Sequence, residues 1–296
     1  MKYANLHLHS VYSDGVLTPL ELCQKAKEMG YGAIALTDHD TVSGVEDLKK
    51  ACAETGMDYI QGMEAAVGAK ELGCSFHIVA YDFDPTAPEI AEYIRQKNEY
   101  TYAKTKAKFD AGIELGVYHG FTWQDVLDLA PKGAWINNEH LFLALIKYMG
   151  YTQADYWNYS KAFAGHKIEV KAPRCNFTYP RLIKAIRDAG GVASLAHPRK
   201  TTQHLPMLVD LGLNCVEYDH PGIDSYDGTE AYRFAVEHNL YLAGGTDHTG
   251  QLANHAVERG ISPSFDPAVS VCPDVRDVYN GSTKEEFEAL KNRIYG

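Results

Sequence analysis

The chain has 296 residues, of which 45% are apolar and 23% charged, and this composition excludes a disordered, a collagen-like or a coiled-coil protein. No apolar run reaches the roughly 20 residues that span a bilayer, and the first residues lack the apolar core of a signal peptide, so we expect a cytoplasmic protein without membrane contact. The net charge of −11 argues against duplex nucleic acid as a partner, although bound metal ions can still attract a small anionic substrate.

Short strands alternate with helices in the first part of the chain. Residues 3–8 alternate as in a strand. Thr18, Pro19 and Glu21 have the pattern of a helix start, with Thr18 as N-cap and Glu21 completing a capping box. Further segments fit strands at 33–36, 59–60 and 76–81 and a helix at 43–55. This alternation predicts parallel strands joined by helices.

The alternation stops at residues 85–172, which are rich in Lys and Tyr and have a helical pattern, and it resumes afterwards. The later segments fit helices at 179–189, 205–211, 230–237 and 284–294 and strands at 192–196, 214–218 and 240–243. We therefore predict an α/β fold close to a barrel, formed by residues 1–84 and 173–296, with 85–172 as a helical insertion. The aromatic side chains of the insertion fit its core or a surface that stacks on a base or sugar.

A pair of histidines stands at the end of the first predicted strand. His7 and His9 are two residues apart, so on a strand both rings project from the same face. Asp14 follows in the next loop. Two imidazoles with a nearby carboxylate suit a divalent metal, although two surface histidines would have the same spacing.

His39 lies just past the predicted strand at 33–36, between Asp38 and Asp40. We expect these carboxylates to fix the tautomer of a metal-binding imidazole. Asp40 or Ser43 could also cap the helix that follows, and both interpretations can hold together.

Other side chains of this kind stand at the ends of further predicted strands, namely Glu64, His77, His197 and Asp247. Glu64 is a candidate carboxylate bridge between two metal ions, or else a solvated loop residue. His77 alone would fit a core histidine. Because strand ends converge in a barrel, the whole set predicts a polynuclear metal site.

In residues 1–84 and about 178–250 the sequence resembles the PHP (polymerase and histidinol phosphatase) domain. The motifs are His7-x-His9-Ser10, Ser13-Asp14-Gly15, Thr37-Asp38-His39-Asp40, Glu64, His77, Ala196-His197-Pro198 and Gly245-Thr246-Asp247. The insertion is similar to that of phosphoesterases related to the 3′,5′-nucleoside-bisphosphate phosphatase. The resemblance implies a distorted (β/α)7 barrel with two or three divalent ions, which Mn, Fe, Zn or Mg would satisfy. It also implies hydrolysis of small phosphate esters by a metal-bridging hydroxide.

The resemblance also implies a role for each residue of these motifs. A first metal ion would be held by His7, His9, Glu64 and Asp247. Glu64 would bridge to a second ion, which would be held by His77 and His197. A third position would use Asp14 and His39. Glu64, His197 and Asp247 would thereby act directly in catalysis.

Three positions depart from the family pattern. Asn5 stands where an Asp precedes the first histidines, and Asn138-Glu139-His140 keeps only the last residue of an Arg-Pro-His element. Thr249 stands where the last motif has a His, with His248 one residue earlier. Either His248 turns inward as a ligand, or the third position is weak, and we expect two firmly held ions with a weaker third.

Cations near these strand ends are candidate substrate ligands. Arg199 and Lys200 follow His197, and Arg174 follows the insertion. Arg pairs with phosphate through two parallel hydrogen bonds, whereas Lys offers a point charge. A solvated surface position is the alternative for each.

We therefore expect an enzyme that hydrolyses a nucleotide or sugar phosphate, as a monoester or cyclic diester. A metal-dependent amidohydrolase is one alternative, but no Lys stands at a strand end after Glu64, where a carboxylated lysine would bridge metals. A non-catalytic metal-binding domain is another. The oligomeric state stays open.

Overall fold

The computed structural model describes residues 2–152, 155–248 and 280–293, without the side chains of residues 157 and 160. Seven strands form one sheet in the chain order β1 to β7. The strands are β1 (Ala4–Asn5), β2 (Ala33–Leu36), β3 (Asp58–Ala69), β4 (Cys74–Tyr81), β5 (Val192–Leu195), β6 (Cys215–Asp219) and β7 (Tyr241–Gly244).

The helices follow the same order along the chain. They are α1 (Pro19–Glu28), α2 (Val45–Thr55), α3 (Pro88–Glu114), α4 (Trp123–Leu127), α5 (Asn138–Met149), α6 (Tyr156–Lys161), α7 (Tyr179–Asp188), α8 (Leu205–Asp210), α9 (Ser225–Glu237) and α11 (Lys284–Asn292), with short 3-10 turns at Lys70–Leu72 and Thr202–His204. The predicted capping box at Thr18 and Glu21 is confirmed at the start of α1. Among the described helices, none is long and apolar enough to cross a membrane.

Backbone hydrogen bonds close the sheet into a ring. The amide of Leu6, just after β1, donates to the carbonyl of Gly244 in β7 at 3.0 Å. Further along, the amide of Asp247 donates to the carbonyl of His7 at 2.9 Å. The two chain segments therefore run side by side, and the fold is the predicted distorted barrel of seven strands.

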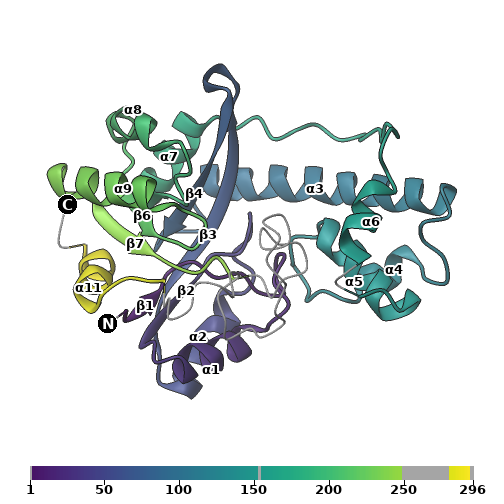
Figure 1. The fold of residues 1–296 in the computed structure, drawn as a ribbon, viewed down its shortest axis with the longest axis horizontal. Coiled ribbons are helices and arrows are strands. Elements are labelled where there is room, and N and C mark those ends of the chain that lie inside the picture. Colours follow the sequence, from purple (N-terminus) through teal and green to yellow (C-terminus); the bar gives the residue numbers. More distant parts are fainter. Residues whose placement is uncertain (1, 153–154, 249–279, 294–296) are drawn as a thin grey trace.

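The expectation of parallel strands throughout is wrong for two pairs. β3 pairs with β4 and β4 with β5 in antiparallel orientation, whereas the other neighbours are parallel. β3 and β4 are joined by residues 70–73 alone, which are too few for the crossover that parallel strands need. The resulting long hairpin projects beyond the rest of the sheet (Figure 1).

Helices α3 to α6 lie between β4 and β5 in the chain. The 27-residue helix α3 runs from the sheet to the group formed by α4, α5 and α6 (Figure 1). This group has an apolar core of its own, which includes Phe109, Tyr118, Phe121, Leu141, Phe142, Leu145 and Tyr159. The cores beside the strands are formed by other residues.

Candidate metal centre

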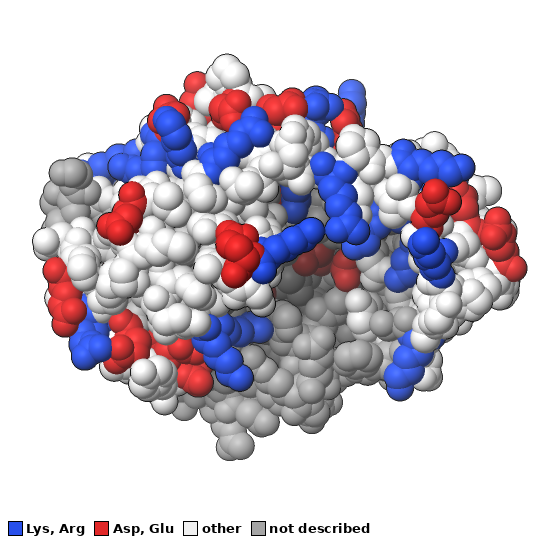
Figure 2. Space-filling model, turned by 90° about the horizontal axis from the view of Figure 1, so that it is seen from above, with Lys and Arg blue, Asp and Glu red and all other residues white. Residues whose placement is uncertain are grey.

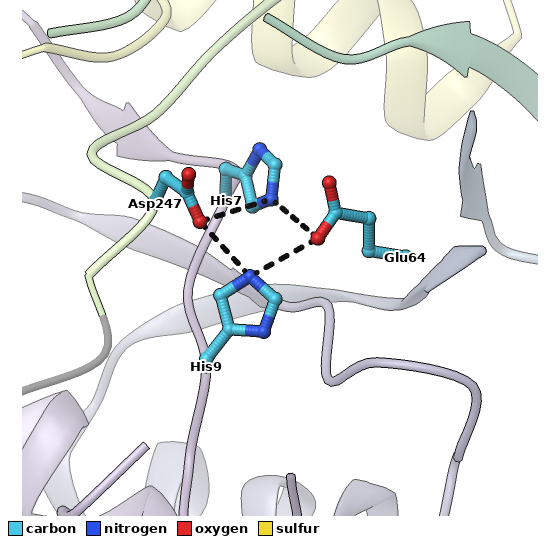
Figure 3. Close-up of side chains that lie close together, drawn as sticks. All are labelled: His7, His9, Glu64 and Asp247. Carbon is cyan, nitrogen blue, oxygen red and sulfur yellow. Dashed lines mark ion pairs between the residues drawn. The ribbon is translucent and has the colours of Figure 1, made fainter. Parts of the chain in front are cut away.

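The chain that follows β1 carries His7 and His9. It is not regular strand, but its backbone is held extended, because the amide of His9 donates to the carbonyl of His248 at 3.0 Å. Residues two apart in extended chain point the same way. Both rings accordingly face the carboxylates of Glu64 and Asp247 (Figure 3).

Among the described residues, these four side chains form the largest group that could hold a metal ion. Glu64 Oε2 lies 3.5 Å from His7 Nε2 and 3.4 Å from His9 Nε2. Asp247 Oδ1 lies 3.6 Å and 3.1 Å from the same two nitrogens. One ligand atom from each residue lies within 4.8 Å of the others.

The donor set fits a divalent ion. The Nε2 atoms of His7 and His9 are buried, and neither makes a hydrogen bond within the described part of the chain. A buried polar atom without a partner is costly, and an ion between these nitrogens and the two carboxylates would satisfy it. Imidazole with carboxylate is a donor set that Zn, Mn and Fe accept.

Glu64 lies between two sets of histidines. Its Oε1 is 2.8 Å from His77 Nδ1 and 2.9 Å from His197 Nε2. Its Oε2 faces His39 Nδ1 at 3.1 Å in addition to the first pair. Glu64 and His77 stand within β3 and β4, not past strand ends as expected, because both strands continue into the hairpin. The geometry still allows one carboxylate to serve two ions.

A third group joins the two loops beyond β1 and β2. Asp14 Oδ1 lies 3.4 Å from His9 Nδ1, and Asp14 Oδ2 lies 3.7 Å from His39 Nε2. These three residues also have ligand atoms within 4.8 Å of one another.

The expectation that Asp38 and Asp40 orient His39 is wrong. Asp38 accepts hydrogen bonds from the amide and hydroxyl of Ser10, each at 2.7 Å, and thereby holds the loop before Asp14. Asp40 accepts from the Tyr93 hydroxyl at 2.5 Å. Asp40 does not cap α2, whose N-cap is Gly44. Both carboxylates fix the loops around the site instead of its histidine.

Mutual charge outweighs burial at the centre of the site. Burial alone would raise the pKa of Glu64, but His39, His77 and His7 hold that pKa well below its usual value. Burial would lower the pKa of His7, yet the surrounding carboxylates raise it well above the usual value. At His197 burial prevails and lowers the pKa to about 4. Protons and a divalent cation would therefore compete for these groups.

The backbone is strained at two residues of the site. Asp247 has φ of 51° and His197 has φ of 27°, in the left-handed region that residues with a Cβ rarely adopt. Such backbone is typical of functional sites, where surrounding structure holds it in place. Here it turns both side chains toward Glu64 and its histidines.

Sequence analysis missed two buried residues behind the site. Glu217 of β6 lies 3.2 Å from His7 Nδ1, and His220 Nε2 lies 3.3 Å from Asp247 Oδ2. The signal was present, because His220-Pro221 follows the predicted strand at 214–218 just as His197-Pro198 follows its own.

The other predicted site residues lie further from this cluster or outside its groups. His248 is buried, but no candidate metal group among the described residues includes it, and Thr249 lies outside those residues. The Arg199 guanidinium packs against Gly222, two residues after His220. Lys200 lines a hollow beside α9, and the Arg174 guanidinium lies 6.0 Å from the Tyr100 ring. Their roles as metal or substrate ligands stay predictions.

The insertion reaches the site through residues 135–140. The Trp135 ring lies 5.3 Å from the His39 ring, and its amide donates to the carbonyl of Tyr12 at 2.8 Å. Asn137 Nδ2 donates to the carbonyl of Ser13 at 3.4 Å and so contacts the loop that bears Asp14. Within the described residues, the Trp135 indole nitrogen is buried without a hydrogen bond.

Comparison with known proteins agrees with this geometry. A family model described as the PHP domain matches residues 5–162, more than half of the chain. A phosphoribosyl 1,2-cyclic phosphate 1,2-diphosphodiesterase from Eggerthella lenta is 28% identical, covering 84% of this chain and 94% of that protein. A 5′-3′ exoribonuclease from Haemophilus influenzae is 29% identical, covering 67% and 69%.

Two further relatives cover most of both chains. A 3′,5′-nucleoside bisphosphate phosphatase from Chromobacterium violaceum is 26% identical, covering 83% of this chain and 87% of that protein. The solved structure of a Bifidobacterium adolescentis protein assigned as a metal-dependent phosphoesterase has a TM-score of 0.76 at 23% identity, covering 99% and 96%. The structural likeness establishes the fold.

Proposed function

The chain belongs to the PHP domain family and is a hydrolase of phosphate esters, and from that premise we propose that its substrate is a small nucleotide or sugar phosphate. The bond cleaved is that of a monoester or a cyclic diester. The observation that carries the proposal is Glu64, whose two oxygens face separate sets of histidines. A phosphate ester needs such a site, because its hydrolysis requires an activated water and neutralised phosphate oxygens.

Specific residues would hold the metal ions. We propose His7, His9, Glu64 and Asp247 for the first ion and Glu64, His77 and His197 for the second, with Asp14 and His39 at a weaker third position. Ions bound there would supply Lewis-acid activation of water and charge for the phosphate oxygens. The protein's part is to hold the ligands in a dry, rigid arrangement, which burial of His7, His9 and Glu64 provides.

Cations would hold the rest of the substrate. On the face drawn in Figure 2, a hollow has acidic side chains at its floor and Lys and Arg side chains along its rim. Arg199 is the best placed of the predicted substrate ligands, because it lies against the loop after β6, next to His220. Residues 85–172 would act as a lobe on the barrel of residues 1–84 and 173–296, with Trp135 forming one wall beside His39.

A phosphate-release screen of the metal-loaded protein tests this function. The panel would contain a 3′,5′-nucleoside bisphosphate, a ribose 1,2-cyclic phosphate, short single-stranded RNA and an N-acyl amino acid. We expect turnover of one of the small phosphate esters and loss of that turnover in His9→Ala, which removes an imidazole from the first ion. Turnover of the N-acyl compound alone would favour an amidohydrolase, and turnover of RNA alone would favour a nuclease.

A further inference from the structure

We propose that Glu217 of β6 and His220, which follows β6, form a positioning layer behind the candidate metal centre. Glu217 fixes the ring of His7 and His220 fixes the carboxylate of Asp247, and neither binds a metal ion. The inference rests on the proposed function, because it assigns how two of the metal ligands are held. It also decides whether His7, Glu217 and His220 form a separate metal site or a set of hydrogen bonds behind the first one. The ligand atoms of His7, Glu217 and His220 lie within 4.8 Å of one another, as those of a separate metal site would.

Glu217 determines which nitrogen of His7 faces the site. Its two carboxylate oxygens lie 3.2 Å and 3.3 Å from His7 Nδ1. An ionised carboxylate only accepts hydrogen bonds, so the His7 proton must be on Nδ1. The lone pair is then on Nε2, the atom that faces Glu64 and Asp247. A carboxylate behind a ligating imidazole is a common way to fix its tautomer and orientation.

The same carboxylate holds a second part of the site. Glu217 Oε2 accepts a hydrogen bond from the backbone amide of His197 at 2.7 Å. That amide belongs to the residue with φ of 27°, so the bond stabilises the strained turn that places the His197 ring against Glu64. Glu217 is only 2% exposed, so solvent does not compete for either bond. One residue of β6 thereby orients candidate ligands from the segments that follow β1 and β5.

His220 has its own tautomer fixed by the backbone. The amide of Gly222 donates to His220 Nδ1 at 2.8 Å, so this nitrogen carries a lone pair and the neutral ring carries its proton on Nε2. Nε2 lies 3.3 Å from Asp247 Oδ2 and can donate to it. With both nitrogens engaged, the neutral ring has no lone pair left for a metal ion. His220 therefore acts as a hydrogen-bond donor.

The two carboxylate oxygens of Asp247 then have different partners. Oδ2 faces His220, whereas Oδ1 faces the Nε2 atoms of His7 and His9. Restricting one oxygen restricts the rotation of the carboxylate and keeps the other oxygen in the first metal group. Removing His220 should therefore weaken metal binding without removing a ligand.

Nitrogen NMR of histidine-labelled full-length protein tests the tautomers directly. Spectra would be recorded without metal and after loading with Zn²⁺, and His220→Gln would identify the signals of His220. We expect His220 to keep an unprotonated Nδ1 and a protonated Nε2 in both states, and His7 to be protonated at Nδ1. A zinc-induced coordination shift at either nitrogen of His220 would make it a ligand and overturn the inference.

Zinc affinity, measured by competition with a chelator, gives a second readout. Glu217→Gln and His220→Gln should each bind Zn²⁺ about 10- to 100-fold more weakly at unchanged stoichiometry, the usual effect of removing a partner of a metal ligand. Glu286→Gln is the matched control, because Glu286 accepts a hydrogen bond from the neighbouring β6 residue Tyr218 at 3.0 Å but lies outside the site. The zinc affinity of Glu286→Gln should equal that of the unaltered protein.

The outcomes separate this inference from the proposed function. Unchanged zinc affinity in both variants, or loss of a whole ion in either, would refute the positioning layer even if the unaltered protein releases phosphate. Failure of the unaltered, metal-loaded protein to release phosphate would refute the function instead. If Glu217→Gln does not fold, the NMR of the unaltered protein and His220→Gln still decide the question.

Discussion

The carboxylate of Glu64 is surrounded by five imidazoles at 2.8 to 3.5 Å, and it is 1% exposed. We predict that Glu64→Gln loses at least one bound ion and about 100-fold or more of the phosphate-release activity, because an amide is a weak ligand and carries no charge. Elemental analysis and a phosphate assay measure the two effects. Glu46→Gln, at an exposed carboxylate of α2, is the control. Retained metal with full activity would remove Glu64 from the centre.

Arg199 allows a separate test of substrate binding. Its guanidinium packs on Gly222, beside the loop that bears His220. We predict that Arg199→Ala raises KM about tenfold or more with kcat little changed if the guanidinium holds a remote phosphate. A fall in kcat would instead place it on the reacting phosphate. Unchanged steady-state kinetics would show that Arg199 is a surface cation.

Single residues show what the sequence could predict about the site and what it could not. The convergence of strand ends in a barrel explains why His7, His9 and Asp247 lie close together, but not Glu64, which lies within β3. The partners of Asp38 could not be predicted, because its hydrogen bonds to Ser10 depend on how a loop folds back. Such contacts are set by tertiary structure and leave no periodic pattern in the sequence.

At the level of elements, the orientation of β3 and β4 shows what a sequence pattern cannot predict. The apolar pattern predicted most of β4 but only residues 59–60 of β3, and the orientation of a strand pair depends on the link between the strands. The link of residues 70–73 contains Gly73, whose φ of 68° allows a tight turn. In this region the sequence predicted strands only at 59–60 and 76–81, so the short link and the antiparallel pairing that it requires could not be predicted.

The segment before α5 connects the insertion to the candidate metal centre. Trp135 lies against His39, and Trp123 lies in the insertion core beside Phe109. We predict that Trp135→Phe raises KM for the phosphate ester several-fold with little loss of stability. Its indole nitrogen has no hydrogen-bond partner within the described residues, so a bound substrate could take that donor. Trp123→Phe should leave KM unchanged, and equal effects of both would contradict a specific role.

Lys108 of α3 gives the insertion a pH-dependent stability. Burial lowers its pKa from 10.5 to about 8, although Glu139 opposes this. Between these two values the unfolded chain holds a proton that the folded chain has released, so stability rises with pH there. We predict that the unaltered protein gains stability relative to Lys108→Met from about pH 8 to 10.5 in urea denaturation. Lys132→Met, at an exposed lysine, should show no such trend.

Over the whole molecule, the barrel holds a buried group of His, Asp and Glu side chains whose ligand atoms lie within 4.8 Å of one another. The net charge of −11 adds to the attraction for divalent cations. We predict that removing metal with a chelator lowers Tm by several degrees and that one divalent ion restores it, because an ion that binds only the folded chain stabilises it. An unchanged Tm would contradict a metal centre built into the fold.

The most direct test of the account is a titration of metal-stripped protein with Mn²⁺ or Zn²⁺, in which bound metal and phosphate release are measured on the same samples. The two sets of ligands that share Glu64 predict that activity is absent without metal and rises until about two ions are bound per chain. Full activity of the stripped protein, or saturation at less than about one bound ion per chain, would contradict the metal-dependent mechanism.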